Sequence, residues 1–260
     1  MTNRVSITIE GGVADVRLSR ADKMNAIDPP MFAALADAIE RLSASPGLRC
    51  VVLSGEGRGF CAGLDMESMA AGGSGLDLAA RTHGPANLPQ HVAWGWRTLP
   101  VPVIAALHGV ALGGGLQIAA GADVRIARAD ARLSIRELHW GIVPDMAGYA
   151  LWRGSVRDDV MRELIYSARE VDGEEAARLG LVTRVAEDPL AEAFALAQAI
   201  AARNPDAIRA AKRLANLSLE NNAAAILAAE SAEQLKLLRS ANQVEQVRAN
   251  LEGRAPHFAD

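Results

Sequence analysis

Short apolar runs alternate with segments of helical spacing along most of the chain. Alternating or continuous apolar residues predict six strands, at residues 5–9, 13–18, 50–54, 101–107, 124–127 and 131–135. Gly11 and Gly12 separate the first two strands, which predicts a β-hairpin. Apolar residues three and four positions apart predict helices that begin at Pro29, near Val92 and at Gly113. Strands that alternate with helices favour an α/β fold with a largely parallel sheet.

From residue 158 onward the pattern is mostly helical. Apolar residues at helical spacing predict four long helices, at residues 188–203, 206–218, 222–238 and 243–251. These helices carry more apolar faces than an isolated appendage would expose. Some of them must therefore pack on the core or on another subunit.

Two glycine-rich loops each follow a predicted buried strand and precede a predicted helix. The first is GEGRGFCAGLDMESM at residues 55–69, and the second holds a glycine triplet at residues 113–115. Each glycine costs a helix about 1 kcal/mol against alanine, so a triplet at a helix start suggests a close backbone approach. Backbone N–H groups at a helix start attract negative charge. Two such loops could aim two N–H groups at one carbonyl oxygen and form an oxyanion hole. For the loop with the glycine triplet, a tight strand-to-helix turn without a binding role is the simpler alternative.

Composition and charge narrow the class of protein. The 260 residues are half hydrophobic and carry a net charge of −4, which suits one large α/β domain or two small ones. No basic run is present, so we expect no nucleic-acid partner. The first residues lack a signal pattern and no apolar run reaches the roughly 18 residues of a membrane span, so we expect a cytoplasmic protein without a membrane partner. The histidines and the two cysteines, Cys50 and Cys61, lack metal-ligand spacing, so we expect no metal.

Several motifs, in sequence order, resemble the crotonase superfamily of enoyl-CoA hydratases and isomerases. They are KMNAI (23–27), GFCAGLD (59–65), HGVALGGGLQIAAGADVRIA (108–127), RELHWGIVPDMAG (136–148) and GEEAARLGLVTRV (173–185). The resemblance implies a crotonase-like ββα spiral core with an acyl-CoA site over residues 1–195, and a C-terminal helical oligomerisation region over residues 196–260. It also implies a homotrimer or a dimer of trimers. The family's two oxyanion donors are backbone N–H groups, which correspond here to Leu64 and Gly114.

Two carboxyls after the second loop are the candidates for proton chemistry. Glu137 lies among apolar residues, and such surroundings raise the pKa of a carboxyl toward neutrality. Asp145 follows eight residues later, and two carboxyls that approach across a turn can divide into an acid and a base. Asp145 could instead cap a helix that starts near Met146. The resemblance aligns Glu137 with a catalytic glutamate.

The residue at position 117 bears on which reaction the resemblance implies. Crotonase hydratases carry a second glutamate there, and the pair activates a water; this chain has Gln117, which can hold a water but cannot take its proton. Simple enoyl-CoA isomerases manage with the glutamate aligned with Glu137. Dienoyl-CoA isomerases carry acids at the Glu137 and Asp145 positions, but also an aspartate at the Gln117 position. The pattern favours isomerisation of an enoyl- or dienoyl-CoA double bond through an oxyanion-stabilised enolate. A 2-enoyl-CoA hydratase of fatty-acid β-oxidation and a non-catalytic acyl-CoA-binding homologue are the alternatives.

The resemblance also implies how the substrate binds. Coenzyme A is part of the acyl-CoA substrate, and no separate cofactor is expected. The residues expected along its pantetheine, adenine and phosphates are Lys23, Met24, Ala62, Gly63, Asp65 and Met66. Trp140 is expected to line the acyl pocket, the loop 72–89 to shape it, and Arg254 to reach a phosphate, on its own or a neighbouring subunit. For Lys23 and Arg254, plain surface charge is the alternative.

Overall fold

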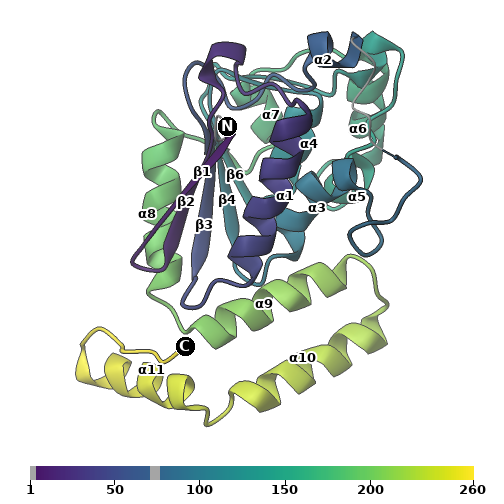
Figure 1. Ribbon diagram of the computed structural model, residues 1–260. Helices are drawn as coiled ribbons and strands as arrows, with labels where there is room; N and C mark the ends of the chain where they lie inside the picture. Colours follow the sequence, from purple (N-terminus) through teal and green to yellow (C-terminus); the bar gives the residue numbers. More distant parts are fainter. Residues whose placement is uncertain (1–3, 71–76) are drawn as a thin grey trace.

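The computed structural model describes residues 4–70 and 77–260, which contain a central six-stranded sheet (Figure 1). Its strands, in chain order, are β1 (Val5–Glu10), β2 (Val13–Leu18), β3 (Cys50–Gly55), β4 (Val103–Leu107), β6 (Val124–Ala127) and β8 (Arg184–Val185). Neighbours in the sheet follow the order β1-β2-β3-β4-β6-β8. β1 and β2 form the predicted antiparallel hairpin, and the later pairs are parallel. The predicted α/β fold is confirmed; residues 72–76 of the loop expected to shape the acyl pocket lie outside the described residues.

A second, two-stranded sheet joins β5 (Val110–Leu112) to β7 (Arg132–Ser134) in parallel. The sequence pattern predicts β7 but assigns residues 110–112 to a glycine turn, and that assignment is wrong. Three residues are too few to show an alternating pattern. They form a strand because Ala111 and Leu112 lie opposite Leu133 and Ser134, which come from a distant part of the chain.

Helices cover both faces of the central sheet. On one face lie α1 (Pro29–Ser43), α3 (Leu88–Thr98) and α4 (Gly114–Ala120), and on the other lies α8 (Pro189–Ala201) (Figure 1). The shorter elements are η1 (Ala21–Lys23), α2 (Met66–Ala70), η2 (Glu137–Trp140), α5 (Gly148–Trp152), α6 (Asp158–Ser167) and α7 (Gly173–Leu179). The continuous apolar character of β3 and β4 follows from this double cover, because successive side chains point to opposite faces and both faces are buried. In β3, Val51 and Leu53 join the core with α1 and α4, and Val52 packs with Ala193 and Ala197 of α8.

The three last helices extend beyond one end of the sheet (Figure 1). They are α9 (Pro205–Ser218), α10 (Ala223–Leu237) and α11 (Ala241–Glu252). Lys212 ties α9 to the core, because its buried Nζ donates to Asp123 Oδ2 (2.8 Å) and to Val101 O (2.7 Å). α10 and α11 leave large apolar side chains uncovered, with Leu235 73% and Leu251 84% exposed. Within residues 4–70 and 77–260, no helix has both the length and the apolar character that a membrane crossing requires.

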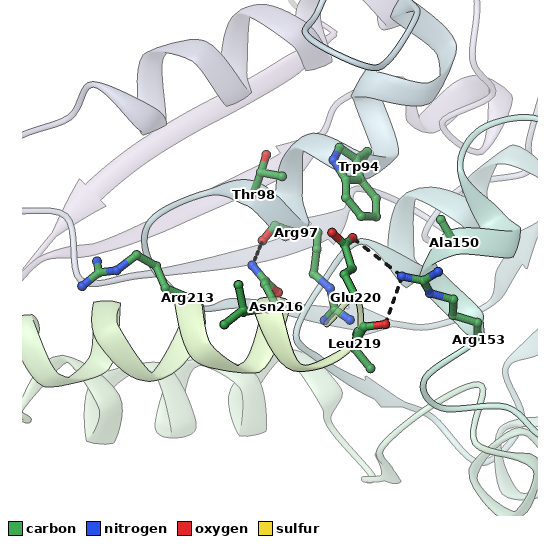
Figure 2. A pocket seen from close by; sticks show the side chains of 10 residues that line it. Trp94, Arg97, Thr98, Ala150, Arg153, Arg213, Asn216, Leu219 and Glu220 are labelled. Carbon is green, nitrogen blue, oxygen red and sulfur yellow. Dashed lines mark hydrogen bonds and ion pairs between the residues drawn. The ribbon is translucent and has the colours of Figure 1, made fainter. Parts of the chain in front are cut away.

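A cavity of about 360 Å³ lies where the C-terminal end of α9 meets α3 and α5 (Figure 2). Asn216 Nδ2 donates to Arg97 O (3.0 Å) at one side of this cavity. Arg153 donates to Leu219 O (3.2 Å) and pairs with Glu220 (3.7 Å) at another. None of the candidate site residues lines it. These contacts attach the C-terminal helices to the core, and the candidate chemistry lies elsewhere.

Candidate active site

The two glycine-rich loops lie side by side. Cys61 N donates to Val110 O and Leu112 N donates to Cys61 O, each at 3.0 Å. A Cβ on Gly115 would lie 2.5 Å from Cys61 O, and Gly113 has a positive φ of 50°, so both positions favour glycine. The triplet therefore has a structural reason: it lets the start of α4 approach the first loop closely.

Leu64 and Gly114, the two predicted oxyanion donors, line one cavity. Gly114 is the first residue of α4, and the first N–H groups of a helix have no partner inside it. Leu64 lies between two bonds made by Ile27, whose N donates to Gly63 O (2.8 Å) and whose O accepts from Asp65 N (3.0 Å). No described residue accepts a hydrogen bond from the Leu64 or Gly114 N–H. Both residues line the same cavity of about 370 Å³, which is compatible with the predicted oxyanion hole.

Glu137 lies in this cavity at the start of η2 and is 5% exposed. Its Oε1 accepts a hydrogen bond of 2.6 Å from Gln117 Nε2. Its Oε2 is buried and has no partner among the described residues. Burial raises the pKa of Glu137, and the charge of Asp145 raises it further, against the lowering effect of the hydrogen bonds from backbone and from Gln117. A carboxyl with a raised pKa and one free oxygen is suited to take up and return a proton.

Gln117 is fully buried in α4 and its amide is held at both ends. Its Oε1 accepts from Met146 N (2.9 Å) and Gly148 N (3.0 Å). These two N–H donors require an oxygen at that end, so the nitrogen must face Glu137. The amide thus orients the Glu137 carboxyl through Oε1 and leaves Oε2 without a hydrogen bond.

Asp145 lies close enough to influence Glu137 but does not line the cavity. The residue is exposed, and partial desolvation raises the pKa of its carboxyl. α5 begins at Gly148 with Ala147 at its N-cap, and no side chain caps it. The alternative that Asp145 caps a helix near Met146 is therefore wrong, because the turn at Ala147 delays the helix by two residues.

Replacing Asp145 by asparagine is expected to lower the pKa of Glu137. The Asp145 carboxylate disfavours a second negative charge nearby, and asparagine removes that repulsion. Glu137 then stays ionised to lower pH, so the acid limb of the kcat/KM profile should move to lower pH. The measurement is that profile for wild type, Asp145→Asn and the control Asp130→Asn, which changes an exposed carboxylate paired with Arg128. An unmoved limb, or a limb moved to higher pH, would contradict the proposed coupling.

The family is decided by comparison with known proteins. The model of the enoyl-CoA hydratase/isomerase family matches residues 8–260. The chain belongs to this family.

It is 31% identical over 249 residues to enoyl-CoA hydratase EchA19 of Mycobacterium tuberculosis, covering 94% of this chain and 91% of the relative. It is 30% identical over 263 residues to the mitochondrial Delta(3,5)-Delta(2,4)-dienoyl-CoA isomerase of Mus musculus, covering 93% and 77%. The crystal structure of enoyl-CoA hydratase from Bacillus anthracis superposes with a TM-score of 0.89, at 26% identity and with 98% of each chain covered. The crotonase superfamily and its fold are confirmed, and the protein is an enzyme of this enoyl-CoA hydratase/isomerase family.

Four more of the residues predicted for substrate binding in this crotonase enzyme line the cavity. They are Ala62, Gly63, Met66 and Trp140. Met24 does not line the cavity. Its carbonyl oxygen accepts a hydrogen bond from Ala62 N (2.9 Å) and so supports the first glycine-rich loop.

Three other predicted binding residues are engaged with protein groups. Asp65 is buried against Arg20 (2.6 Å), and its Oδ1 accepts from the backbone at the start of α2. Although burial acts to raise it, the pKa of Asp65 is lowered by Arg20 and these N–H groups. Lys23 is exposed and pairs with Glu67 (2.9 Å). Arg254 follows α11, a helix that lies far from α2 in Figure 1, and pairs with Glu245 (2.6 Å). In this single chain Lys23 and Arg254 do not meet the cavity, and their roles toward coenzyme A stay predictions.

The sequence pattern does not indicate a charged cluster at the same cavity. Arg132, Arg136 and Glu170 line it together with Ile142. Glu170 lies 34 residues beyond Arg136, and no spacing rule links the two.

Asn25 is a further residue to which the sequence pattern assigns no role. It is buried, and its Nδ2 donates to Gly59 O (3.0 Å) and Phe60 O (3.1 Å), which fixes the first glycine-rich loop. Its place in the KMNAI motif was the available signal.

The two thiols are poor candidates for chemistry. Burial raises the pKa of Cys50 and of Cys61 to about 12, so both stay protonated near neutral pH. In the part of the chain that the structure describes, no group of three or more His, Cys, Asp or Glu side chains is placed to hold a metal ion.

Proposed function

We propose that this enzyme moves a carbon–carbon double bond of an enoyl-CoA thioester, with Glu137 as the proton carrier. The observation that carries the proposal is the orientation of one carboxyl: Gln117 Nε2 holds Glu137 Oε1 at 2.6 Å, while Oε2 is buried and unpartnered. This arrangement offers one proton-accepting atom. A reaction that removes and returns a single proton needs no more.

The proposed steps use the backbone and side-chain groups of residues that line the cavity. The thioester oxygen accepts from the N–H groups of Leu64 and Gly114, and each such donor is worth a factor of about 10²–10³ in rate. Glu137 Oε2 takes a proton from C2 of a 3-enoyl thioester, and the electron pair delocalises onto the thioester oxygen as an enolate. The same carboxyl returns the proton at C4, so the double bond moves to C2–C3 and no atom is gained or lost. In this scheme Asp145 acts by raising the pKa of Glu137, which makes the returning proton easier to hold.

Hydration is the second candidate, since a relative is named as a hydratase. Adding water needs a group that takes a proton from the water and another that protonates carbon. Gln117 cannot accept a proton, and its amide already bonds Glu137, Met146 N and Gly148 N. Hydration would therefore rest on Glu137 alone.

The deciding experiment offers three thioesters separately: a 2-enoyl-CoA, a 3-enoyl-CoA and a 3,5-dienoyl-CoA. Isomerisation leaves the mass unchanged and shifts the ultraviolet absorbance of the conjugated system, whereas hydration adds the mass of water. We expect an unchanged mass with a new spectrum for the 3-enoyl or the dienoyl substrate. Water addition at a comparable or higher rate would overturn the proposal.

Replacing Gln117 by glutamate is expected to shift the enzyme toward hydration. The new carboxyl would lie about 2.6 Å from Glu137 Oε1, where the amide nitrogen is now. Two adjacent carboxyls share a proton, which supplies the acid and the base that water addition requires. We expect isomerisation to fall about 10-fold or more and the ratio of hydrated to isomerised product to rise. The control is Gln198→Glu on α8, an exposed site of the same chemistry. An unchanged product ratio would show that position 117 does not select the reaction.

We also propose that the C-terminal helices assemble the enzyme into a homotrimer or a dimer of trimers. The exposed leucines of α10 and α11 support this, because uncovered apolar side chains of this size favour burial against another surface. The mass in solution, measured by light scattering, tests it. A monomer at micromolar concentration would contradict the proposal.

A further inference from the structure

The cavity that holds Glu137 has a cationic side that plays no part in the proton transfer proposed above. Arg132 is the first residue of β7, Arg136 immediately precedes η2, and Glu170 lies between α6 and α7. All three line the cavity together with Leu64 and Gly114. The connection through α6 thus places the Glu170 carboxylate beside the guanidinium groups of Arg132 and Arg136 at the cavity.

One carboxylate is shared between the two arginines. Arg132 Nε donates to Glu170 Oε2 (2.7 Å), and Arg136 Nη1 donates to Glu170 Oε1 (2.5 Å). The hydrogen bond from Arg132, with a second from Arg136, lowers the pKa of Glu170, so this carboxyl is ionised. Two positive charges therefore face one negative charge.

Most of the donors of these arginines are unused. A guanidinium has five N–H donors, and each arginine side chain donates to Glu170 and to no other described residue. Arg136 is sheltered, with 31% of its side chain exposed, while Arg132 is 62% exposed at the outer edge. Their charge does not keep Glu137 ionised, because the pKa of Glu137 is raised. The surplus positive charge has no partner among the described residues, and both arginines line the cavity that contains Glu137.

We propose that Arg132 and Arg136 bind a carboxylate on the acyl group, so that the enzyme prefers thioesters of dicarboxylic acids. This inference rests on the proposed acyl-CoA function and names its substrate class. A phosphate of coenzyme A offers similar anionic chemistry, but the pantetheine arm separates it from the thioester. The arginines share a cavity of about 370 Å³ with the carbonyl-binding donors, which favours a group close to the thioester.

Equilibrium binding of saturated thioesters tests the inference without any turnover. Glutaryl-CoA and pentanoyl-CoA have acyl chains of equal carbon number and differ by the terminal carboxylate. The corresponding pantetheine thioesters lack the phosphates. Calorimetry on the full-length protein would measure the dissociation constant of each of the four ligands. The proteins compared are wild type, Arg136→Gln, Arg132→Gln, Glu170→Gln and the control Arg128→Gln. Arg128 also pairs with an aspartate (2.9 Å) but is exposed and does not line the cavity.

We expect wild type to bind glutaryl-CoA more tightly than pentanoyl-CoA, and glutaryl pantetheine more tightly than pentanoyl pantetheine. Arg136→Gln should weaken both glutaryl ligands roughly 10- to 100-fold and change the pentanoyl ligands less than about 3-fold, as for loss of a charged hydrogen bond. Arg132→Gln should act in the same direction with a smaller effect, because it is more exposed. Glu170→Gln keeps both arginines and should tighten glutaryl binding.

Three results would overturn the inference. If the arginine variants lose affinity equally for glutaryl-CoA and pentanoyl-CoA, and lose none for the pantetheine ligands, the arginines bind a phosphate of coenzyme A. If Arg136→Gln changes the affinity for none of the four ligands, the two arginines and Glu170 form a surface ion-pair cluster without a binding role. If no acyl ligand binds the wild type, the proposed acyl-CoA function itself fails, whereas selective binding without turnover would retain the substrate class and reject only the reaction.

Discussion

The Glu137→Gln variant is expected to isomerise its substrate about 10²–10⁴-fold more slowly than wild type. Glutamine keeps the shape of the side chain, and its carbonyl can accept the same hydrogen bond from Gln117 Nε2. It cannot take a proton at the position of Oε2, so the loss should appear in kcat with little change in KM. The measurement is the initial rate by ultraviolet absorbance on the substrate that wild type uses.

The same variant should gain stability relative to wild type as the pH rises through the folded pKa of Glu137. Burial raises the pKa of Glu137 in the folded state above its unfolded value. A group of this kind contributes stability below its unfolded pKa and loses that contribution as the pH rises through the folded pKa. Above that folded pKa wild type carries a buried charge that glutamine lacks, so the melting temperature of Glu137→Gln relative to that of wild type should rise as the pH is raised. Toward pH 4 the difference should disappear, since Glu137 is then neutral.

Glu163→Gln is the matched control, because Glu163 is a half-exposed carboxylate on α6 that pairs with Arg169 (2.7 Å). It should retain wild-type turnover. If Glu137→Gln retained full turnover, Glu137 would not be the proton carrier, and a binding role without catalysis would regain support.

Replacing Gly114 by proline is expected to slow the reaction about 10²–10³-fold, the typical cost of one oxyanion donor. Proline has no N–H, and it is tolerated at the first position of a helix, where that N–H has no helical partner. The substitution therefore removes the donor while leaving the hydrogen bonds within α4 intact.

Gly114→Ala separates the lost donor from the added bulk. Its Cβ would lie 2.8 Å from Met146 Sδ and 3.2 Å from Ile27 Cδ1, and a proline ring would meet the same side chains. Alanine keeps the N–H, so its rate should lie well above that of proline. Rates and melting temperatures of both variants should be compared, since equal losses of rate would attribute the effect to packing against Met146 and not to the missing N–H.

Local patterns were enough to predict most of the fold. The alternation of β1 and β2 around two glycines, and the apolar runs of β3 and β4, are properties of neighbouring residues, and the hairpin and the parallel strands followed from them. β5 escaped prediction because its three residues become a strand only when β7, twenty residues later, lies beside it. The helical tail was likewise readable from spacing, whereas spacing did not predict which of its leucines the single chain leaves exposed.

The same distinction between local pattern and tertiary contact applies to the candidate site. The sequence alone determined which residue types are available: the glycine loops that can present N–H groups, a glutamate among apolar neighbours, and a glutamine where a second acid could stand. Only the tertiary structure decided what each of them faces. The direction of the Gln117 amide depends on Met146 N and Gly148 N, the free oxygen of Glu137 depends on that amide, and the surplus positive charge at the cavity depends on Glu170. Hydrogen bonds and charge act over a few ångströms in space, and residues that are 20 to 34 positions apart become neighbours only after the chain has folded.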